Sequence, residues 1–289
     1  MSRRHTLSPP ARLLYEPLLR AALAEDLGTA GDLTTDAIID AGATARAAIV
    51  ARRDGVAAGV GIAGETFALL DPDVTVGTCV PDGDHVRHGT VLATVAGPAR
   101  AILTGERVAL NLLGRLCGIA TATAMFVTAV GDHHARIVPT RKTTPGLRML
   151  ERYAVRAGGG ADHRFGLADG VLIKDNHIAA AGGITAAVDR ARRRVGHMVA
   201  IEVEVDTLDQ LDEAVALPIT AVLLDNMTPD TLAEAVARTP DGIVTEASGG
   251  ITLETVPRVA AAGVDLISVG WLTHSAPALD IGLDITASS

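Results

Sequence analysis

The sequence predicts an α/β protein in which a barrel of parallel strands follows a smaller N-terminal region. The first observation is a set of six apolar, β-rich runs that alternate with helix-like stretches: 135–138, 171–173, 199–205, 221–224, 243–245 and 266–269. The second is the spacing of 30, 21 and 23 positions between the polar residues that close four of these runs: Lys174, Glu204, Asp225 and Ser248. Each interval suits one strand plus a crossover helix. Repeated units of similar size predict a closed barrel with its site at the C-terminal strand ends, although six runs are fewer than the eight of a complete barrel.

The N-terminal region is predicted to begin with an amphipathic helix and to continue as a mostly β segment. Residues 12–26 carry leucine and alanine at helical spacing, and glycines follow them. Short β-rich runs fill residues 45–100, where Gly83 and Gly89 are typical of the tight turns in lipoyl-like barrel-sandwich modules. The segment has no lysine that could carry a lipoyl or biotinyl group. We therefore expect it to be a scaffold.

A strongly helical stretch joins the two regions. Residues 103–130 predict one long helix or two consecutive helices that begin near Thr104. The helices between the later strands are expected at 184–194, 208–216, 229–238 and 253–262. We accordingly expect a first domain at 1–115 and a second at 116–289, with the last residues able to pack back on the first.

Composition excludes several classes of function. Aromatic residues make up 2% of the 289 residues and the formal net charge is −9, which argues against nucleic-acid binding and against an anionic membrane surface. The longest stretch without a charged side chain, 116–131, has 16 residues and is too short to predict a transmembrane helix. Cys79 and Cys117 lack partners at metal-ligand or disulfide-framework spacing. We expect a cytoplasmic protein.

Lysine usage marks a candidate anion site. Only Lys142 and Lys174 are lysines among the 25 basic residues, although arginine serves everywhere else. A compact ammonium suits a crowded phosphate or oxyanion site better than a planar guanidinium does. The surrounding stretch is strongly basic and contains Arg141, Arg148, Arg152, Arg156, His163, Arg164 and His177. An anionic ligand is the natural interpretation, and a solvated helix face is the alternative for Arg152 and Arg156.

A second cluster of predicted site residues is acidic. In the run AIEVEVD, Glu202 and Glu204 share one face of a strand and point into the barrel. Two buried like charges need compensation by a cation such as Lys174, by protonation or by a metal held through a ligand. With Asp225 they form an acidic wall opposite the basic one, which suits a reaction that develops positive charge while an anion departs. A structural ion-pair network is the alternative.

Glycines follow the last two predicted strands. They occur in EASGGI at 246–251 and in SVG at 268–270. Backbone amides at such positions bind phosphate in many barrels. Together with the basic cluster, they predict a phosphate-binding site.

Six motifs occur in the order in which one enzyme family carries them: TRKTTPGLR at 140–148, GGG followed by HR at 158–164, LIKDNH at 172–177, EVEVD at 202–206, LLDN at 223–226 and SGGI at 248–251. Together they resemble the quinolinate phosphoribosyltransferase family over essentially the whole chain. The resemblance implies an N-terminal α/β sandwich domain and an incomplete, seven-stranded TIM-like α/β barrel. It also implies a homodimer that converts quinolinate and phosphoribosyl pyrophosphate, with Mg²⁺, to nicotinate mononucleotide, pyrophosphate and carbon dioxide in NAD biosynthesis.

The resemblance also assigns roles to residues of this chain. Arg141, His163 and Arg164 would bind the quinolinate carboxylates, and Arg107 would reach across from the neighbouring subunit. It implies catalytic roles for Lys142, Lys174, Glu204 and Asp225, and it adds the following residues to the substrate site: Thr140, Ser248, Gly249, Gly250, Gly270 and His274. The last five would surround the 5-phosphate. No residue is expected to ligate Mg²⁺ directly, because the ion would arrive with the pyrophosphate near Glu204 and Asp225.

Two positions depart from the family pattern and three other functions stay open. Pro139 replaces an aspartate before Thr-Arg-Lys, and Asp162 replaces an asparagine before His-Arg, so substrate affinity is the property most open to change.

A Schiff-base lyase would use Lys174 as its nucleophile. A related phosphoribosyltransferase, specific for nicotinate or associated with molybdenum transport, would need another base pocket, whereas LIKDNH favours quinolinate. A non-catalytic binding protein would have little reason to retain Lys142, Lys174, Glu204 and Asp225.

Overall fold

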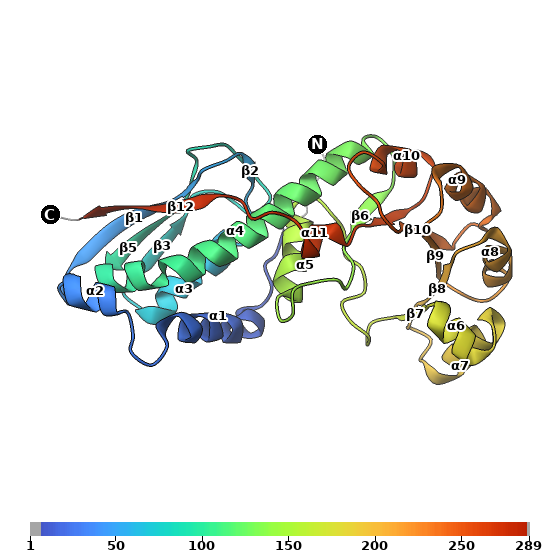
Figure 1. The fold of residues 1–289 in the computed structure, drawn as a ribbon, viewed down its shortest axis with the longest axis horizontal. Helices are drawn as coiled ribbons and strands as arrows, with labels where there is room; N and C mark the ends of the chain where they lie inside the picture. The colour runs from blue at the N-terminus through green and yellow to red at the C-terminus, as the bar shows by residue number, and fades with distance from the viewer. Residues whose placement is uncertain (1–6, 288–289) are drawn as a thin grey trace. The chain divides into compact units, whose positions relative to one another are not determined.

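The computed structural model describes residues 7–287 as two compact units (Figure 1). The first unit contains the described residues up to Ala124, the segment Thr143–Gly159 and the residues from Thr273 onward. The second unit contains Met125–Lys142 and Gly160–Leu272. Each unit therefore draws on separate stretches of the chain.

The first unit is built on an antiparallel sheet with the strand order β12-β1-β5-β3. These strands are β1 (Thr44–Ala51), β3 (Thr75–Thr78), β5 (Val91–Pro98) and β12 (Ile281–Ala287). The short strands β2 (Gly55–Val56) and β4 (His85–Val86) pair separately. Because β12 pairs with β1 from Ala45↔Ala287 to Ala51↔Ile281, the end of the chain completes this sheet.

Helices α1 (Arg12–Leu27), α2 (Leu33–Ile38), α3 (Val60–Leu70), α5 (Arg148–Ala157) and most of α4 (Ala99–Val130) complete the first unit. Helix α3 contacts β3 and β5, and its Phe67 is fully buried with Ile49 and Leu92 of the sheet. Helix α4 passes close to the 273–280 segment, because a Cβ at Gly118 would lie 2.1 Å from the carbonyl oxygen of Pro277. Only glycine permits this approach.

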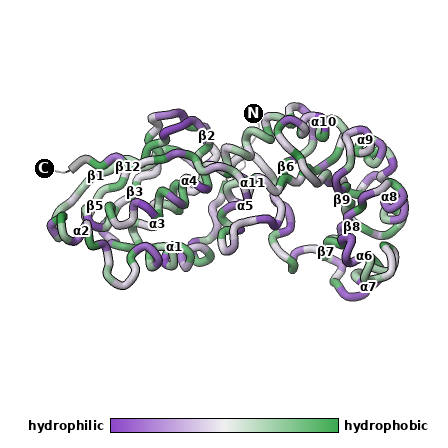
Figure 2. Tube along the Cα trace, viewed as in Figure 1, coloured by the Kyte–Doolittle hydropathy of each residue, from purple (hydrophilic) through white to green (hydrophobic). Residues whose placement is uncertain are grey.

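The second unit contains a parallel sheet with the order β6-β11-β10-β9-β8-β7. Its six described strands are β6 (Arg136–Val138), β7 (Val171–Ile173), β8 (Ile201–Val205), β9 (Ala221–Asp225), β10 (Val244–Ser248) and β11 (Leu266–Ser268). Helices α6 (Asp175–Ala181), α7 (Ile184–Arg194), α8 (Leu208–Val215), α9 (Pro229–Arg238) and α10 (Val256–Ala261) occupy the connections. Along these helices hydrophilic and hydrophobic segments alternate in the trace (Figure 2), as expected for elements with one face on a sheet.

Local signals account for several helix boundaries. Thr207 and Gln210 form a reciprocal capping box at the start of α8, and Thr228 caps α9 directly before Pro229. The expected ranges 184–194 and 229–238 are confirmed without change. The joining stretch forms one continuous helix, α4, which begins at Ala99 rather than near Thr104.

Two expectations change in detail. The segment expected to be mostly β contains helix α3. Six of its eleven residues are buried, so the sequence has few outward polar residues that would reveal helical periodicity. The last expected helix begins at Val256 instead of Leu253, because Thr252 and Thr255 form a hydrogen-bonded turn before it.

Helix α4 is also long and apolar enough, by length and composition, to cross a membrane. Most of its apolar stretch is buried inside the protein, as in the core helix of many folds. It is the only described helix with these properties.

Candidate active site

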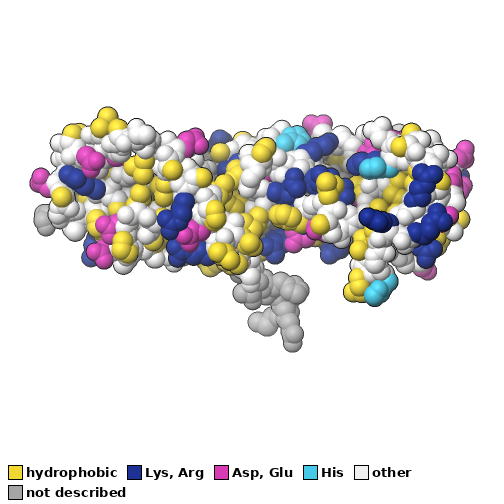
Figure 3. Space-filling model, turned by 90° about the horizontal axis from the view of Figure 1, so that it is seen from below, with side chains coloured by type: hydrophobic (Ala, Val, Ile, Leu, Met, Phe, Trp, Pro, Cys, Tyr) yellow, Lys and Arg dark blue, Asp and Glu magenta, His cyan; other side chains and the backbone are white. Residues whose placement is uncertain are grey.

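The C-terminal ends of the parallel strands carry most of the predicted site residues of the second unit. Lys174 directly follows β7, Glu204 lies near the end of β8, and Asp225 and Ser248 are the last residues of β9 and β10. The 140–142 segment follows β6, and Gly270 follows β11. Because all six strands are parallel, these residues meet at one edge of the sheet. On the face drawn in Figure 3, Lys and Arg side chains lie around an apolar area of this unit.

The acidic and basic walls meet in an ion pair at the ends of β7 and β8. The Lys174 ammonium contacts the Glu204 carboxylate, which confirms the expectation that a lysine compensates one of the strand carboxylates. The Lys174 side chain is 43% exposed and that of Glu204 is 13% exposed. Lys174 also donates its backbone N–H to Nδ1 of His177 at 3.0 Å, so the following helix α6 fixes the backbone at this strand end.

Guanidinium groups provide the second cationic feature. Burial lowers the pKa of Arg164, and the positive charge of Arg141 lowers it further, so the two side chains interact electrostatically. Arg164 Nη1 donates to the carbonyl oxygen of Gly170 at 3.3 Å. Two neighbouring guanidiniums favour an anion between or beside them, since a carboxylate relieves their repulsion and accepts paired hydrogen bonds.

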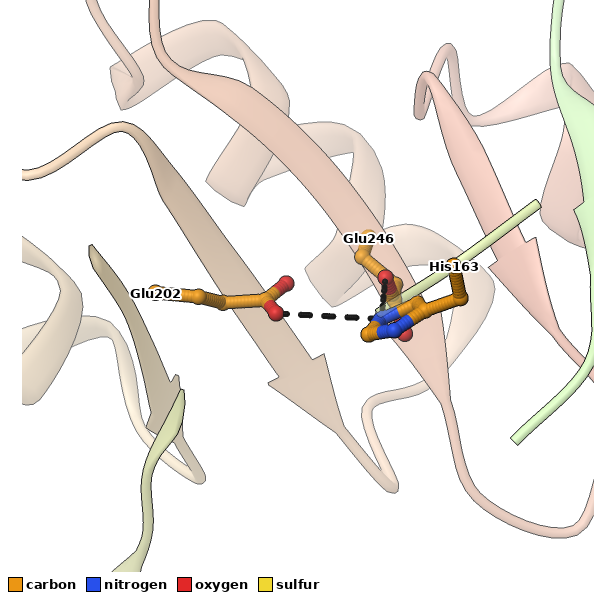
Figure 4. A group of neighbouring side chains, drawn as sticks. All are labelled: His163, Glu202 and Glu246. Atoms are coloured by element: carbon orange, nitrogen blue, oxygen red, sulfur yellow. Dashed lines mark hydrogen bonds and ion pairs between the residues drawn. The ribbon is translucent and has the colours of Figure 1, made fainter. Parts of the chain in front are cut away.

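A buried acid–base cluster contains His163, Glu202 and Glu246 (Figure 4). His163 Nε2 lies 3.0 Å from Glu246 Oε2 and 3.8 Å from Glu202 Oε2. The two glutamates come from β10 and β8, which flank β9, and both are buried. Sequence reasoning placed Glu202 in the acidic wall but did not single out Glu246, whose only signal was its position in the EASGGI motif.

The pKa values in this cluster shift because of burial and like charge. Burial raises the pKa of Glu202 to about 7, and the charge of Glu246 acts in the same direction. Burial opposes protonation of His163, but the hydrogen bond and charge of Glu246, with the charge of Glu202, outweigh it and raise the pKa of His163. The cluster thus holds protons where ordinary glutamates would have lost them.

The turn after β10 requires glycine. Gly249 has a φ of +99°, and a Cβ there would lie 2.1 Å from Oδ1 of Asn226. Asn226 donates its backbone N–H to the carbonyl oxygen of Ser248 at 2.9 Å and its side-chain amide to Asp225 at 2.6 Å. The Ser248–Gly250 turn and the end of β9 are therefore held together by Asn226, which sequence reasoning had quoted only as part of LLDN.

Two predicted residues lie in the first unit. Arg107 is exposed on α4, in a groove lined by α1, α4 and Leu147. His274 is exposed and shares a 2.6 Å hydrogen bond with Ser275. Nearby, Arg115 ties α4 to the buried carboxylate of Glu151 and to the carbonyl oxygens of Thr273 and Ala276, which fixes the backbone that carries His274.

Comparison with known families assigns both parts of the chain. Residues 32–117 match the family model of the quinolinate phosphoribosyl transferase N-terminal domain, and residues 119–284 match that of the C-terminal domain. The chain belongs to the quinolinate phosphoribosyltransferase family. The resemblance inferred from the six motifs is confirmed.

Individual members of the quinolinate phosphoribosyltransferase family are similar over nearly their full length. A probable carboxylating nicotinate-nucleotide pyrophosphorylase of Bacillus subtilis (strain 168) is 51% identical over 277 residues, or 96% of this chain and 95% of that one. The carboxylating nicotinate-nucleotide pyrophosphorylase of Mycobacterium leprae (strain TN) is 44% identical over 92% of this chain and 95% of its own. The crystal structure of NadC from Streptococcus pyogenes matches with a TM-score of 0.94 and 38% identity, and it covers 98% of this chain and all of that one.

A metal could be considered for the His163 cluster, since one ligand atom from each of its three residues lies within 4.8 Å of the others. The contacts favour a hydrogen-bonded cluster instead. His163 Nε2 already lies within hydrogen-bond distance of Glu246 Oε2, at 3.0 Å. A ligating histidine and carboxylate would both have to be deprotonated.

Proposed function

We propose that this protein catalyses phosphoribosyl transfer to quinolinate with loss of carbon dioxide. The proposed reaction converts quinolinate and phosphoribosyl pyrophosphate to nicotinate mononucleotide, pyrophosphate and carbon dioxide, which makes the protein a decarboxylating pentosyltransferase. The observation that carries the proposal is the Lys174–Glu204 pair at the strand ends, together with the interacting guanidiniums of Arg141 and Arg164, in a chain of this family. This edge offers cations to a dianionic pyridine and carboxylates to a developing cation.

Quinolinate would bind to the guanidinium groups. Arg141 and Arg164 lie close enough to interact, and each can accept a carboxylate in its planar fork. His163 and Lys142 belong to the same site in this proposal. Lys142 donates its backbone N–H to Thr140 Oγ1 at 3.1 Å, and this hydrogen bond holds the turn that carries Arg141. We propose a homodimer in which Arg107 of the neighbouring subunit completes the pocket.

The phosphoribosyl group would lie over the ends of β8 to β11. Glu204 and Asp225 would face the ribose and stabilise its positive charge, and Lys174 would exchange Glu204 for a phosphate or pyrophosphate oxygen. The 5-phosphate would bind to the turn of Ser248, Gly249 and Gly250, supported by Gly270 and His274. Mg²⁺ would enter as part of the phosphoribosyl pyrophosphate substrate, coordinated by pyrophosphate oxygens near Glu204 and Asp225.

The proposed chemistry needs no protein nucleophile. The pyridine nitrogen forms a bond to the anomeric carbon while the bond from that carbon to the pyrophosphate oxygen breaks, and pyrophosphate takes the electron pair. The pyridinium then accepts the electron pair released as the adjacent carboxylate leaves as carbon dioxide, and a proton from water replaces it on the ring. Catalysis comes from positioning and electrostatic stabilisation. Lys174 already pairs with Glu204, whereas a Schiff-base lyase would need the lysine amine free to attack a carbonyl carbon.

Finer features of the fold are part of the same proposal. The parallel sheet would be the family's incomplete, seven-stranded barrel, with residues near Ala161 as the additional strand. In support, the Ala161 N–H donates to the carbonyl oxygen of Ile137 in β6 at 2.8 Å, beside an edge of the sheet. We also propose a cytoplasmic location, consistent with two free cysteines.

The test supplies the purified protein with Mg²⁺, phosphoribosyl pyrophosphate and either quinolinate or nicotinate. Nicotinate mononucleotide and carbon dioxide from quinolinate alone would establish the proposal. Product from nicotinate alone would retain the transfer reaction and overturn the substrate. No product from either, with a carbonyl substrate trapped on Lys174 by borohydride, would establish the lyase instead.

A further inference from the structure

Asn226 has an unusual backbone conformation. Among the residues that the structure describes, it is the only non-glycine residue with a positive φ, at 55°. A Cβ disfavours this left-handed region, although asparagine tolerates it better than most residues. Asn226 directly follows β9, at the strand-end edge that carries the predicted site. Backbone outliers of this kind cluster at functional sites, where the surrounding structure holds them.

The Asn226 side chain contacts two parts of the predicted site. Its amide nitrogen donates to Asp225 Oδ2 at 2.6 Å. An ionised carboxylate only accepts hydrogen bonds, so the nitrogen faces Asp225 and the amide oxygen faces the other way. That oxygen lies against Gly249, where an added Cβ would be 2.1 Å from it. With its backbone N–H donated to the carbonyl oxygen of Ser248 at 2.9 Å, Asn226 connects the end of β9 to the turn after β10.

We propose that Asn226 is a positioning residue for phosphoribosyl pyrophosphate: its amide orients the Asp225 carboxylate, and its contact with Gly249 sets the place of the turn. This inference rests on the proposed function, in which Asp225 faces the ribose and the turn binds the 5-phosphate of the same molecule. The amide bond uses Oδ2 of Asp225 and leaves Oδ1 for the ribose. Because one ligand binds to both groups, their separation must match it, and a residue that touches both can fix that separation.

Exposure argues against a purely structural role for this side chain. Asn226 is exposed, and Asp225 and Gly249 are half-buried. Substitutions at exposed positions usually have little effect on stability. Glycine would adopt the left-handed conformation without strain, so the backbone alone does not require asparagine here. The amide is better explained by its contacts with the two substrate-binding groups than by a contribution to folding.

The expected effect is confined to one of the two substrates. Arg141 and Arg164, which are proposed to bind quinolinate, lie on the segments that follow β6 and precede β7, the two edge strands of the sheet. Asn226 lies between these edges and donates hydrogen bonds to Asp225 and Ser248, at the ends of β9 and β10. Loss of its amide should therefore weaken binding of phosphoribosyl pyrophosphate much more than binding of quinolinate.

The experiment compares Asn226→Gly, Asn226→Asp and the control Ala233→Glu. Glycine keeps the left-handed backbone and removes both amide contacts, whereas aspartate keeps the shape and replaces the donor with a carboxylate. Ala233→Glu adds a negative charge at an exposed position of the following helix, α9. All three variants should unfold near the urea concentration that unfolds the wild type. A much lower unfolding midpoint for Asn226→Gly would overturn the positioning role in favour of a structural one.

Kinetics provide the main readout. Asn226→Gly should raise KM for phosphoribosyl pyrophosphate about 10- to 100-fold, because a hydrogen bond to a charged group is lost, and KM for quinolinate should stay within about threefold. Asn226→Asp should raise KM for phosphoribosyl pyrophosphate at least as much, since two adjacent carboxylates repel each other. Ala233→Glu should resemble the wild type. A wild-type KM for phosphoribosyl pyrophosphate in Asn226→Gly, or equal increases for both substrates, would overturn the proposal.

Calorimetric binding of phosphoribosyl pyrophosphate with Mg²⁺ separates this inference from the proposed function, because it needs no turnover. If the wild type binds this ligand but forms no nicotinate mononucleotide, the proposed function fails, and the affinities of the variants still decide the role of Asn226. If the wild type does not bind it, both fail. If the wild type is active and Asn226→Gly binds the ligand normally, the positioning role fails alone.

Discussion

The parallel-sheet unit contains two acid–base groupings that differ in their access to solvent. Lys174 and Glu204 pair at the strand ends, where the lysine side chain is 43% exposed. Glu246 and Glu202 lie deeper along their strands, in contact with His163 from an irregular segment, and the side chain of Glu246 is 2% exposed. An accessible lysine can exchange its carboxylate partner for a substrate group. Buried side chains keep their partners and hold one another in place. In the proposed reaction, the same sheet would present Lys174 and Glu204 to the substrate and keep the buried carboxylates of Glu202 and Glu246 away from it.

The largest expected effect comes from the exposed pair. Replacing Lys174 with Ala should lower kcat/KM for phosphoribosyl transfer by about 10²- to 10³-fold, because a preorganised charge is lost from the transition state. The free energy of unfolding should fall by on the order of 1–3 kcal/mol at most, because the lysine is 43% exposed but the Glu204 carboxylate, 13% exposed, loses its cation. Steady-state kinetics and urea unfolding of the same preparations would check both values. A large loss of stability would place Lys174 with the supporting groups and break the comparison.

The buried cluster should control stability through pH. The pKa of Glu202 is raised to about 7, whereas glutamate in an unfolded chain titrates at about 4.3. The folded protein keeps a proton that the unfolded chain has lost, so stability is complete below the lower value and declines as pH rises through the higher one. The raised pKa of His163 acts with the same sign.

Glu202→Gln should remove much of this pH dependence. The amide imitates the protonated carboxyl, so the variant should be more stable than the wild type at pH 8 by on the order of 1–3 kcal/mol and similar to it at pH 5. Urea unfolding at both pH values provides the measurement, with Glu254→Gln as the exposed control. Parallel pH profiles for wild type and Glu202→Gln would show that the buried cluster does not favour the protonated acid.

The smallest expected effect concerns Arg141, which is exposed. Arg141→Lys keeps the charge but loses the planar fork, and quinolinate affinity should fall about tenfold with unchanged stability. Isothermal calorimetry with quinolinate measures the change, and Arg193→Lys on the exposed end of α7 is the matched control. Wild-type affinity in Arg141→Lys would mean that a simple positive charge suffices there.

Local pattern explains what the sequence could predict. Regular βα spacing predicted that four polar residues end strands: Lys174, Glu204, Asp225 and Ser248. Because the strands are parallel, it also predicted that these residues lie at the same edge of the sheet. Thr228 and Pro229 marked the start of α9 through capping chemistry that needs no tertiary contact. Six ordered motifs were enough to identify the family.

Tertiary contacts explain what the sequence could not predict. The contact between Glu246 and His163 depends on the placement of Glu246 two strands away from Glu202 and opposite an irregular segment that carries His163. Helix α3 is too evenly buried to show a clear amphipathic period. The pairing of β12 with β1 joins segments more than two hundred residues apart, and no local property of either strand selects the other.

That pairing has a consequence for synthesis of the chain. The ribosome releases β1 long before the partner that covers its edge, because β12 follows more than two hundred residues later. Until then the N-terminal sheet presents an unpaired edge of alanine, isoleucine and valine, which is a template for association with other chains. The first unit is completed only after the second unit's residues have been made, so nascent chains depend on protection of that edge until β12 has emerged.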